Sequence, residues 1–226
     1  KWDINLNFAA NRQTVKELDP SVDMLNLTSG WSGLQVKAAV GEPFSLYGVG
    51  WERDPDGNIL INASNGSRLT SSTAVNLGKI SPDWTLGIGN TLSFKGLSLG
   101  FLIDIRQAGV MYSGTASNLR TSGQAKETLL NDRMPIIDQG VVQQADGTYI
   151  PNTTLIKPYD YWQNYKVGNT EANIFDASYV KLRELTLNYN LPGKWFDKCF
   201  IKKVSVGLEG RNLWIIKSNV PHNDPE

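Results

Sequence analysis

Residues 84–107 read WTLGIGNTLSFKGLSLGFLIDIRQ and decide the fold. On each side of Lys95-Gly96, apolar residues alternate with polar or small ones. This period of two is typical of β-strands with one apolar face. The two-residue break predicts a tight hairpin, so we expect antiparallel strands over 84–95 and 97–107.

The same alternation returns in other parts of the chain. Further strands are expected near residues 1–10, 44–52, 179–191 and 201–214. Two segments, 53–83 and 108–178, are long connections, whereas 192–200 is short and carries Pro192-Gly193. Within the second long segment we expect a small hairpin around Asp146-Gly147 and a short helix over 125–131. The predicted fold class is therefore all-β, with antiparallel strands.

Three details favour a transmembrane barrel over a soluble sandwich. Charged and amide side chains lie in mid-strand on the polar faces, as a wet lumen allows. Trp84 and Phe94 bound the apolar face of one strand. At about 3.3 Å per residue and a tilt of about 40°, they are about 25 Å apart, the height of an outer-membrane apolar band. Short connections also alternate with long ones, as in such barrels.

Composition excludes several other classes of protein. The 226 residues contain 22 basic and 22 acidic side chains, so no net charge favours nucleic acid. The chain has one cysteine, Cys199, expected to be an inert thiol in a short turn, and one histidine, His222. We therefore predict no catalytic residue, no cofactor and no metal site. No apolar run approaches the length of a membrane helix. No signal peptide opens the chain, so we expect a piece of a longer precursor.

Several short runs add specificity to this picture. Residues 176–191 read DASYVKLRELTLNYNL and precede Pro192, and residues 206–214 read VGLEGRNLW. GKISPDW occupies 78–84, and Asp-Pro-Glu closes the chain. Together with DIRQ at 104–107, these runs resemble SusC/RagA-type TonB-linked transporters and follow that family's order. One departure is Ala108-Gly109, where the family usually has Gly-Gly.

The resemblance implies a fold and an activity. The chain would be the C-terminal part of a large, 22-stranded barrel in the outer membrane of a Gram-negative bacterium. Short turns would face the periplasm and long loops the outside. The parent protein would import a glycan or an oligopeptide, energised by TonB, with a SusD-like surface lipoprotein as partner. The plug and the TonB-contacting segment would lie in the missing N-terminal part.

Candidate site residues fall into four groups. Alternation places four charged residues toward the lumen, where they contact the plug or solute or form a solvated wall: Asp104, Arg106, Glu184 and Glu209. By the family's orientation, the outer aromatic girdle contains Trp84 and Trp214, and the inner one Phe94 and Tyr189.

Two cations interrupt an apolar face. Lys181 and Arg183 precede Leu185 on the same side of a regular strand. We expect them at the headgroup level of the outer-membrane lipid, with a snorkelling pair or a salt bridge as the alternative. In the long loop, four aromatic residues are ligand-contact candidates, with local packing or contact with the lid protein as alternatives: Tyr159, Tyr161, Trp162 and Tyr165.

Two other functions compete with transport. A soluble, secreted β-sandwich that binds carbohydrate would explain the alternation and the aromatic loop, but not the DASYVKLREL and GRNLW runs. An enzyme would need a nucleophile and a base, or a metal cluster, and the sequence has neither pattern. The intact parent protein should require detergent if it is a barrel.

Overall fold

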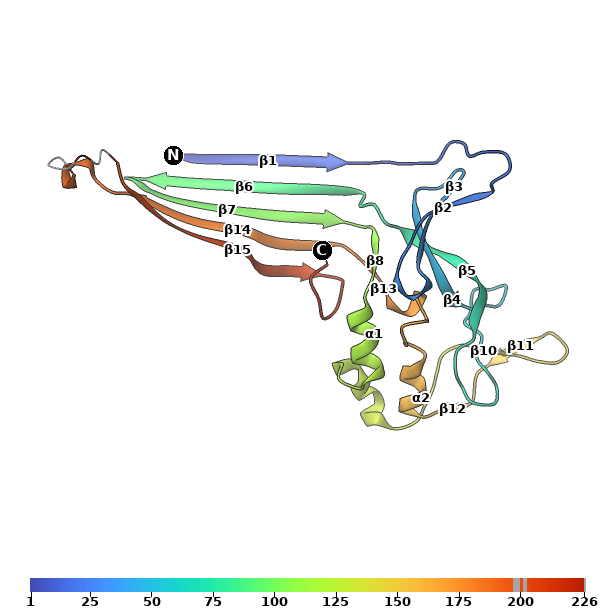
Figure 1. Ribbon diagram of the computed structural model, residues 1–226. Helices are drawn as coiled ribbons and strands as arrows, with labels where there is room; N and C mark the ends of the chain where they lie inside the picture. Colours follow the sequence, from blue (N-terminus) through green and yellow to red (C-terminus); the bar gives the residue numbers. More distant parts are fainter. Residues whose placement is uncertain (197–199, 201–202, 226) are drawn as a thin grey trace.

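The computed structural model describes residues 1–196, 200 and 203–225. Cys199 lies outside these residues. Figure 1 shows a curved sheet of long strands, with a folded region at one of its ends. The sheet has the order β1-β6-β7-β14-β15, and all its neighbours are antiparallel. Its strands are β1 (Trp2–Ala10), β6 (Trp84–Phe94), β7 (Leu97–Gln107), β14 (Tyr179–Asn190) and β15 (Ser205–Ser218).

The two ends of this sheet differ. At one end, here called the turn end, Lys95-Gly96 joins β6 to β7 and residues 191–204 join β14 to β15. At the other, the loop end, residues 11–83 and 108–178 form the folded region (Figure 1). The last strand is displaced relative to the predicted range 201–214.

The two faces of the sheet differ as the alternation requires. Cross-strand pairs such as Leu86 with Ile105 and Leu99 with Leu187 place aliphatic residues on one side, here called the outer face. No second sheet covers this face within the described residues, and large apolar side chains stay exposed on it. Trp2, Ile4, Leu6 and Phe8 are each more than half exposed. The opposite, inner face carries Asn, Thr, Gly and charged residues.

A second sheet begins the folded region at the loop end. Its order is β2-β3-β4-β5. The strands are β2 (Met24–Ser29), β3 (Gln35–Ala39), β4 (Ser45–Trp51) and β5 (Thr70–Lys79), with a 3-10 turn, η1 (Trp31–Gly33), between the first two. The prediction that 53–83 is a connection is therefore wrong over β5. Its first half is polar, TSSTA, so it shows no apolar alternation, and its pairing with β4 makes it a strand.

The long insertion 108–178 is largely ordered. β8 (Val110–Tyr112) pairs with β13 (Ile174–Asp176) just beyond β7 and β14. Between them lie α1 (Gly114–Thr121), η2 (Lys126–Arg133), β9 (Ile136–Ile137), β10 (Val141–Gln143), β11 (Tyr149–Pro151), β12 (Leu155–Ile156), α2 (Pro158–Gln163) and η3 (Glu171–Asn173). One further 3-10 turn, η4 (Gly193–Trp195), lies at the turn end.

Local sequence explains several of these elements. Ser113 caps α1 by accepting a hydrogen bond from the amide of Ala116 at 3.1 Å. Asp146-Gly147 closes the β10–β11 hairpin, with Gly147 at a φ of +85°. The helix expected over 125–131 is a 3-10 segment instead, broken where Asn131 and Asp132 adopt positive φ. No helix among the described residues is long and apolar enough to cross a membrane.

Two glycines of β4 let the long insertion lie directly on this strand. Thr170 is fully buried against Gly48, and its hydroxyl donates to the Val49 carbonyl at 2.8 Å. A Cβ on Gly48 would lie 2.2 Å from the Thr170 hydroxyl oxygen. Beside Gly50, the Glu171 carboxylate accepts from the Trp51 amide at 2.7 Å. Both glycines therefore serve close packing between distant segments.

Replacing Gly48 with Ala is expected to destabilise this contact by about 1–3 kcal/mol, because the added methyl group overpacks a filled site. Hydrogen exchange of the amides in β4 and η3 measures the change. Gly168→Ala is the matched control, since a Cβ there meets nothing within 4 Å. Equal exchange rates in both variants would contradict the packing role.

Candidate functional site

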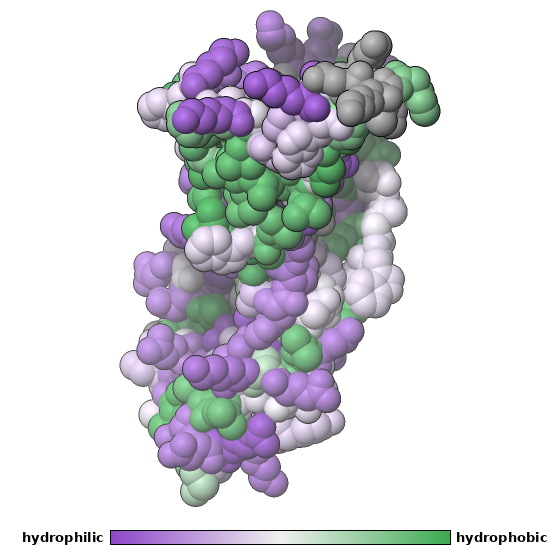
Figure 2. All heavy atoms as spheres, turned by 90° about the vertical axis from the view of Figure 1, so that its left-hand side faces the viewer, coloured by the Kyte–Doolittle hydropathy of each residue, from purple (hydrophilic) through white to green (hydrophobic). Residues whose placement is uncertain are grey.

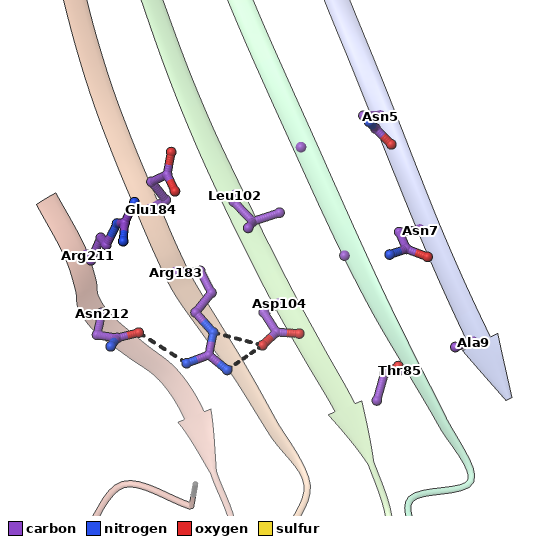
Figure 3. A pocket seen from close by; sticks show the side chains of 12 residues that line it. Asn5, Asn7, Ala9, Thr85, Leu102, Asp104, Arg183, Glu184, Arg211 and Asn212 are labelled. Carbon is purple, nitrogen blue, oxygen red and sulfur yellow. Dashed lines mark hydrogen bonds and ion pairs between the residues drawn. The ribbon is translucent and has the colours of Figure 1, made fainter. Parts of the chain in front are cut away.

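A hollow of about 850 Å³ lies on the inner face of the sheet. Figure 3 shows that residues from all five long strands line it. Asparagines and glycines line the β1–β6 side, whereas charged residues line the β14–β15 side. The lining residues are Asn5, Asn7, Ala9, Thr85, Gly87, Gly89, Leu102, Asp104, Arg183, Glu184, Arg211 and Asn212.

An arginine-centred network forms the charged wall of this hollow (Figure 3). Arg183 donates to Oδ2 of Asp104 from Nε at 3.0 Å and from Nη2 at 2.8 Å. Its third nitrogen, Nη1, donates to the side-chain oxygen of Asn212 at 3.1 Å. The hydroxyl of Tyr179 also donates to Oδ2 of Asp104, at 3.2 Å. The network thus joins three strands, β7, β14 and β15.

Two β-bulges bring these groups together. The register against β7 shifts between Leu182 and Glu184, so that Arg183 is an extra residue on β14. On β15, Asn212 adopts a φ of +51° at the same level. A bulge moves the residues before it to the opposite face of the strand. The residues of β14 that precede the bulge therefore lie on the face opposite to the one that strict alternation predicts.

This bulge overturns the prediction for the two cations of β14. Lys181 lies opposite Asp104 in the register and Arg183 bonds to that carboxylate, so both belong to the inner face. Lys181 is 1% exposed and forms an ion pair with Asp224. The expected contact with lipid headgroups is therefore wrong for both residues, because strict alternation does not hold across residue 183.

The other predicted inner-face residues have separate partners. Glu184 lines the hollow opposite Arg211 in the register. Glu209 accepts a hydrogen bond from Arg211 at 2.5 Å in an exposed pair. Arg106 donates to the carbonyl of Ile80 at 3.0 Å and does not line the hollow. Contact of these side chains with a plug or a solute stays a prediction.

Two residues of the 176–191 run, Asp176 and Ser178, hold the chain in place just before β14 begins. Asp176 accepts hydrogen bonds from the amide and hydroxyl of Ser178, at 2.8 and 2.5 Å, and from the side chain of Asn219. Ser178 in turn accepts from the amide of Ala108, which adopts a φ of +63°. Burial would raise the pKa of Asp176, but these hydrogen bonds outweigh it and lower the pKa below its usual value.

Sequence reasoning missed three partners of the charged inner-face residues. Asn212 binds Arg183, Tyr179 binds Asp104 and Asp224 binds Lys181, and none of the three was a candidate. One signal was available. Two cations on an otherwise apolar face break the alternation of residues 179–191, and such a break is the mark that a bulge leaves in a sequence.

The aromatic cluster of the long loop is a packed core. Tyr161 and Trp162 are each 8% exposed and pack against Ile156. Ring centroids of Tyr161 and Trp162 are 5.0 Å apart, and those of Trp162 and Tyr165 are 5.1 Å apart. The predicted ligand contact is therefore wrong for the buried pair, and the packing alternative holds. On the same helix, Tyr159 is 71% exposed and remains a candidate.

A buried ion pair borders this core. Arg68 donates to Asp138 from Nε at 2.6 Å and from Nη2 at 2.9 Å, and its guanidinium lies 5.3 Å from the ring of Trp51. Burial would lower the pKa of Arg68, but the bond to Asp138 and the charge interactions with Asp138, Tyr165 and Tyr161 together outweigh it and raise the pKa. Burial also raises the pKa of Tyr161. These groups fix the shape of the loop region.

The predicted girdle residues lie at opposite ends of the outer face. Phe94 and Tyr189 both oppose Leu97 at the turn end. Trp84 lies opposite Gln107 at the loop end. Trp214 is 62% exposed and lies level with Ile103 of β7, four residues before Gln107 and so closer to the middle of the sheet. Their contact with the two membrane interfaces stays a prediction.

Comparisons with known proteins agree with this architecture. No family model matches the chain. TonB-dependent receptor P3 of Formosa agariphila is 22% identical in an alignment of 249 positions, which covers all of this chain and 23% of that protein. TonB-dependent receptor P26 of the same organism is 27% identical over 77% of this chain and 17% of that protein. A structure of the RagAB peptide transporter covers 99% of this chain and 24% of its own, with a TM-score of 0.61 and 21% identity. The chain resembles part of a SusC/RagA-like TonB-dependent transporter.

The RagA-like fold places the features described above in a barrel wall. A second structure, of the RagAB peptide importer in a closed-closed state, covers 96% of the chain with a TM-score of 0.55. The chain spans about a quarter or less of the length of all these relatives. A soluble sandwich requires two sheets packed face to face. Here the described residues form a single sheet of long strands whose apolar face is not covered by a second sheet.

Proposed function

We propose that this chain is part of the wall of an outer-membrane importer that works with TonB. The observation that carries the proposal is the two-faced sheet: an exposed apolar outer face, a polar inner face with a hollow, short turns at one end and folded loops at the other. This combination suits a barrel whose outside contacts acyl chains and whose inside is wet. The likeness to RagAB over 99% of the chain supports it.

A peptide is the substrate class we propose to test first, because the structural neighbours are described as peptide transporters or importers. A glycan is the alternative. Cells that lack the gene are compared with complemented cells for uptake of labelled oligopeptides and oligosaccharides, with and without functional TonB. We expect TonB-dependent uptake of one class only. Recovery of the protein in the soluble fraction, or uptake that is insensitive to loss of TonB, would contradict the function.

The inner face is proposed to hold the plug of the complete barrel. Arg183 and Asp104 are joined by two hydrogen bonds, so they stiffen the wall. Glu184 and Arg211, on the adjoining strip of the hollow, are better placed to contact a plug or a passing solute. This division of roles predicts that the wall keeps its shape when the plug moves.

A SusD-like surface lipoprotein is the proposed partner of the loop end. The neighbouring structures are of a two-component system, RagAB. On this chain, Ile137 and Leu155 pair across β9 and β12 and are 52% and 63% exposed, and nearby Met134 is 61% exposed. Exposed aliphatic residues that are grouped in this way favour a protein contact.

Replacing both Ile137 and Leu155 with Asp is expected to weaken co-purification of the lipoprotein at least about tenfold, because two aliphatic contacts are lost. Quantitative mass spectrometry of the purified complex measures the ratio of the two proteins. Val40→Asp is the control, since Val40 is 55% exposed in the turn that follows β3, outside this surface. An unchanged ratio in the double variant would exclude this surface.

A further inference from the structure

The turn end of the sheet carries both exposed aromatic rings and exposed lysines. Phe94 is 72% exposed, Trp195 67% and Phe200 93%. Lys95, Lys194 and Lys203 are exposed beside them, and no described carboxylate forms an ion pair with any of the three. Figure 2 looks at the molecule from this end and shows hydrophilic side chains along the upper edge, above a field of hydrophobic ones.

The first hairpin aims its lysine along the outer face. Lys95 adopts a φ of +46° and Gly96 a φ of +88°, the paired left-handed geometry of a tight two-residue turn. This places Nζ of Lys95 at 5.2 Å from the centroid of the Phe94 ring. Phe94 belongs to the apolar outer face. The charge therefore lies at the boundary of that face and is not directed into the hollow.

The second turn adjoins the first. The amide of Asn190 donates to the carbonyl of Gly96 at 2.8 Å, which joins the end of β14 to the β6–β7 hairpin. Among its described residues, this second turn carries Lys194 and Lys203 and no carboxylate. Two of its three described aromatic residues, Trp195 and Phe200, are among the most exposed of the described residues, whereas Phe196 is half-buried. The two turns thus form one basic and aromatic rim.

We propose that this turn-end rim binds the phosphates of anionic phospholipid headgroups. Aromatic rings favour the boundary between hydrocarbon and headgroups, and lysine extends past this boundary while its stem stays on apolar surface. An anionic lipid supplies the negative charge that the described residues of the rim lack. By contrast, the cations of β14 at the other end already have carboxylate partners, Asp104 and Asp224. The proposal needs only a membrane location for the sheet, not import.

Lipid selectivity of the intact membrane protein tests the proposal. The protein is reconstituted in phosphatidylcholine bilayers that contain spin-labelled phosphatidylglycerol or spin-labelled phosphatidylcholine, and the relative association of the two labels is measured. We expect a preference for phosphatidylglycerol. In a variant with Lys95→Gln, Lys194→Gln and Lys203→Gln, we expect the preference for phosphatidylglycerol at the rim to fall by a factor of roughly five for each lysine removed.

A charge-matched control separates the rim from the overall charge. Lys16→Gln, Lys126→Gln and Lys157→Gln remove three exposed lysines at the loop end and should leave the preference unchanged. An equal loss in both triple variants, or none in the rim variant, would overturn the proposal. If the rim variant does not assemble, salt provides the second measurement. The preference of the unmodified protein should fall as ionic strength rises, and a salt-independent preference would reject the phosphate contact.

Discussion

Replacing Trp162 with Ala is expected to lower the stability of the loop region by about 3–5 kcal/mol, because a buried indole leaves a cavity that its neighbours cannot fill. Trp162 is 8% exposed and contacts the rings of Tyr161 and Tyr165. The sheet should remain folded, since its strands pair independently of this core. Hydrogen exchange of the amides in α2, β9 and β12 measures the local free energy of opening.

The same helix supplies the control. Tyr159→Ala removes a side chain of similar size that is 71% exposed, so exchange in the loop should change little. If Tyr159→Ala reduces substrate binding without changing exchange, Tyr159 is a ligand contact. If Trp162→Ala leaves exchange unchanged and abolishes binding, the packing role of Trp162 is wrong.

Replacing Asp104 with Ala is expected to destabilise the barrel wall by about 2 kcal/mol, because Arg183 loses two charge-assisted hydrogen bonds. Both side chains are 23% exposed, so water compensates for part of the loss. Unfolding of the intact protein by urea in detergent micelles, followed by fluorescence, measures the change. Asn212 retains its bond to Arg183 and limits the effect.

Glu209→Ala is the matched control on the same face. Its pair with Arg211 is exposed, with 72% and 47% of the two side chains accessible, and such pairs contribute about 0–1 kcal/mol. The Asp104 variant should therefore unfold at a clearly lower urea concentration. Equal midpoints for the two variants would show that the arginine network does not stiffen the wall.

The strands of the wall were predictable because their cause is local. Residues 84–94 and 97–107 alternate with a period of two, and side chains of a strand point to opposite faces with that same period. β5 was not predictable in this way. Its polar first half pairs with β4 within the loop region, where the faces of a strand do not separate lipid from water.

The candidate site also shows where prediction from alternation fails. Asp104 and Glu184 could be assigned to the inner face from alternation, and both line the hollow. Arg183 could not, because one extra residue in β14 changes the face of everything before it. Nor could the sequence indicate that Asp224 returns to Lys181 across 43 residues.

The sequence by itself determined that this protein has two-faced antiparallel strands, short turns at one end and long loops at the other. Periodicity and turn residues are properties of neighbouring positions, and these can be read along the chain. Only the tertiary structure decided which cations leave the apolar face, which aromatic residues are buried, and where lysines lie exposed beside aromatic rings. Each depends on the register between strands or on contacts between distant segments, and one inserted residue is enough to change it.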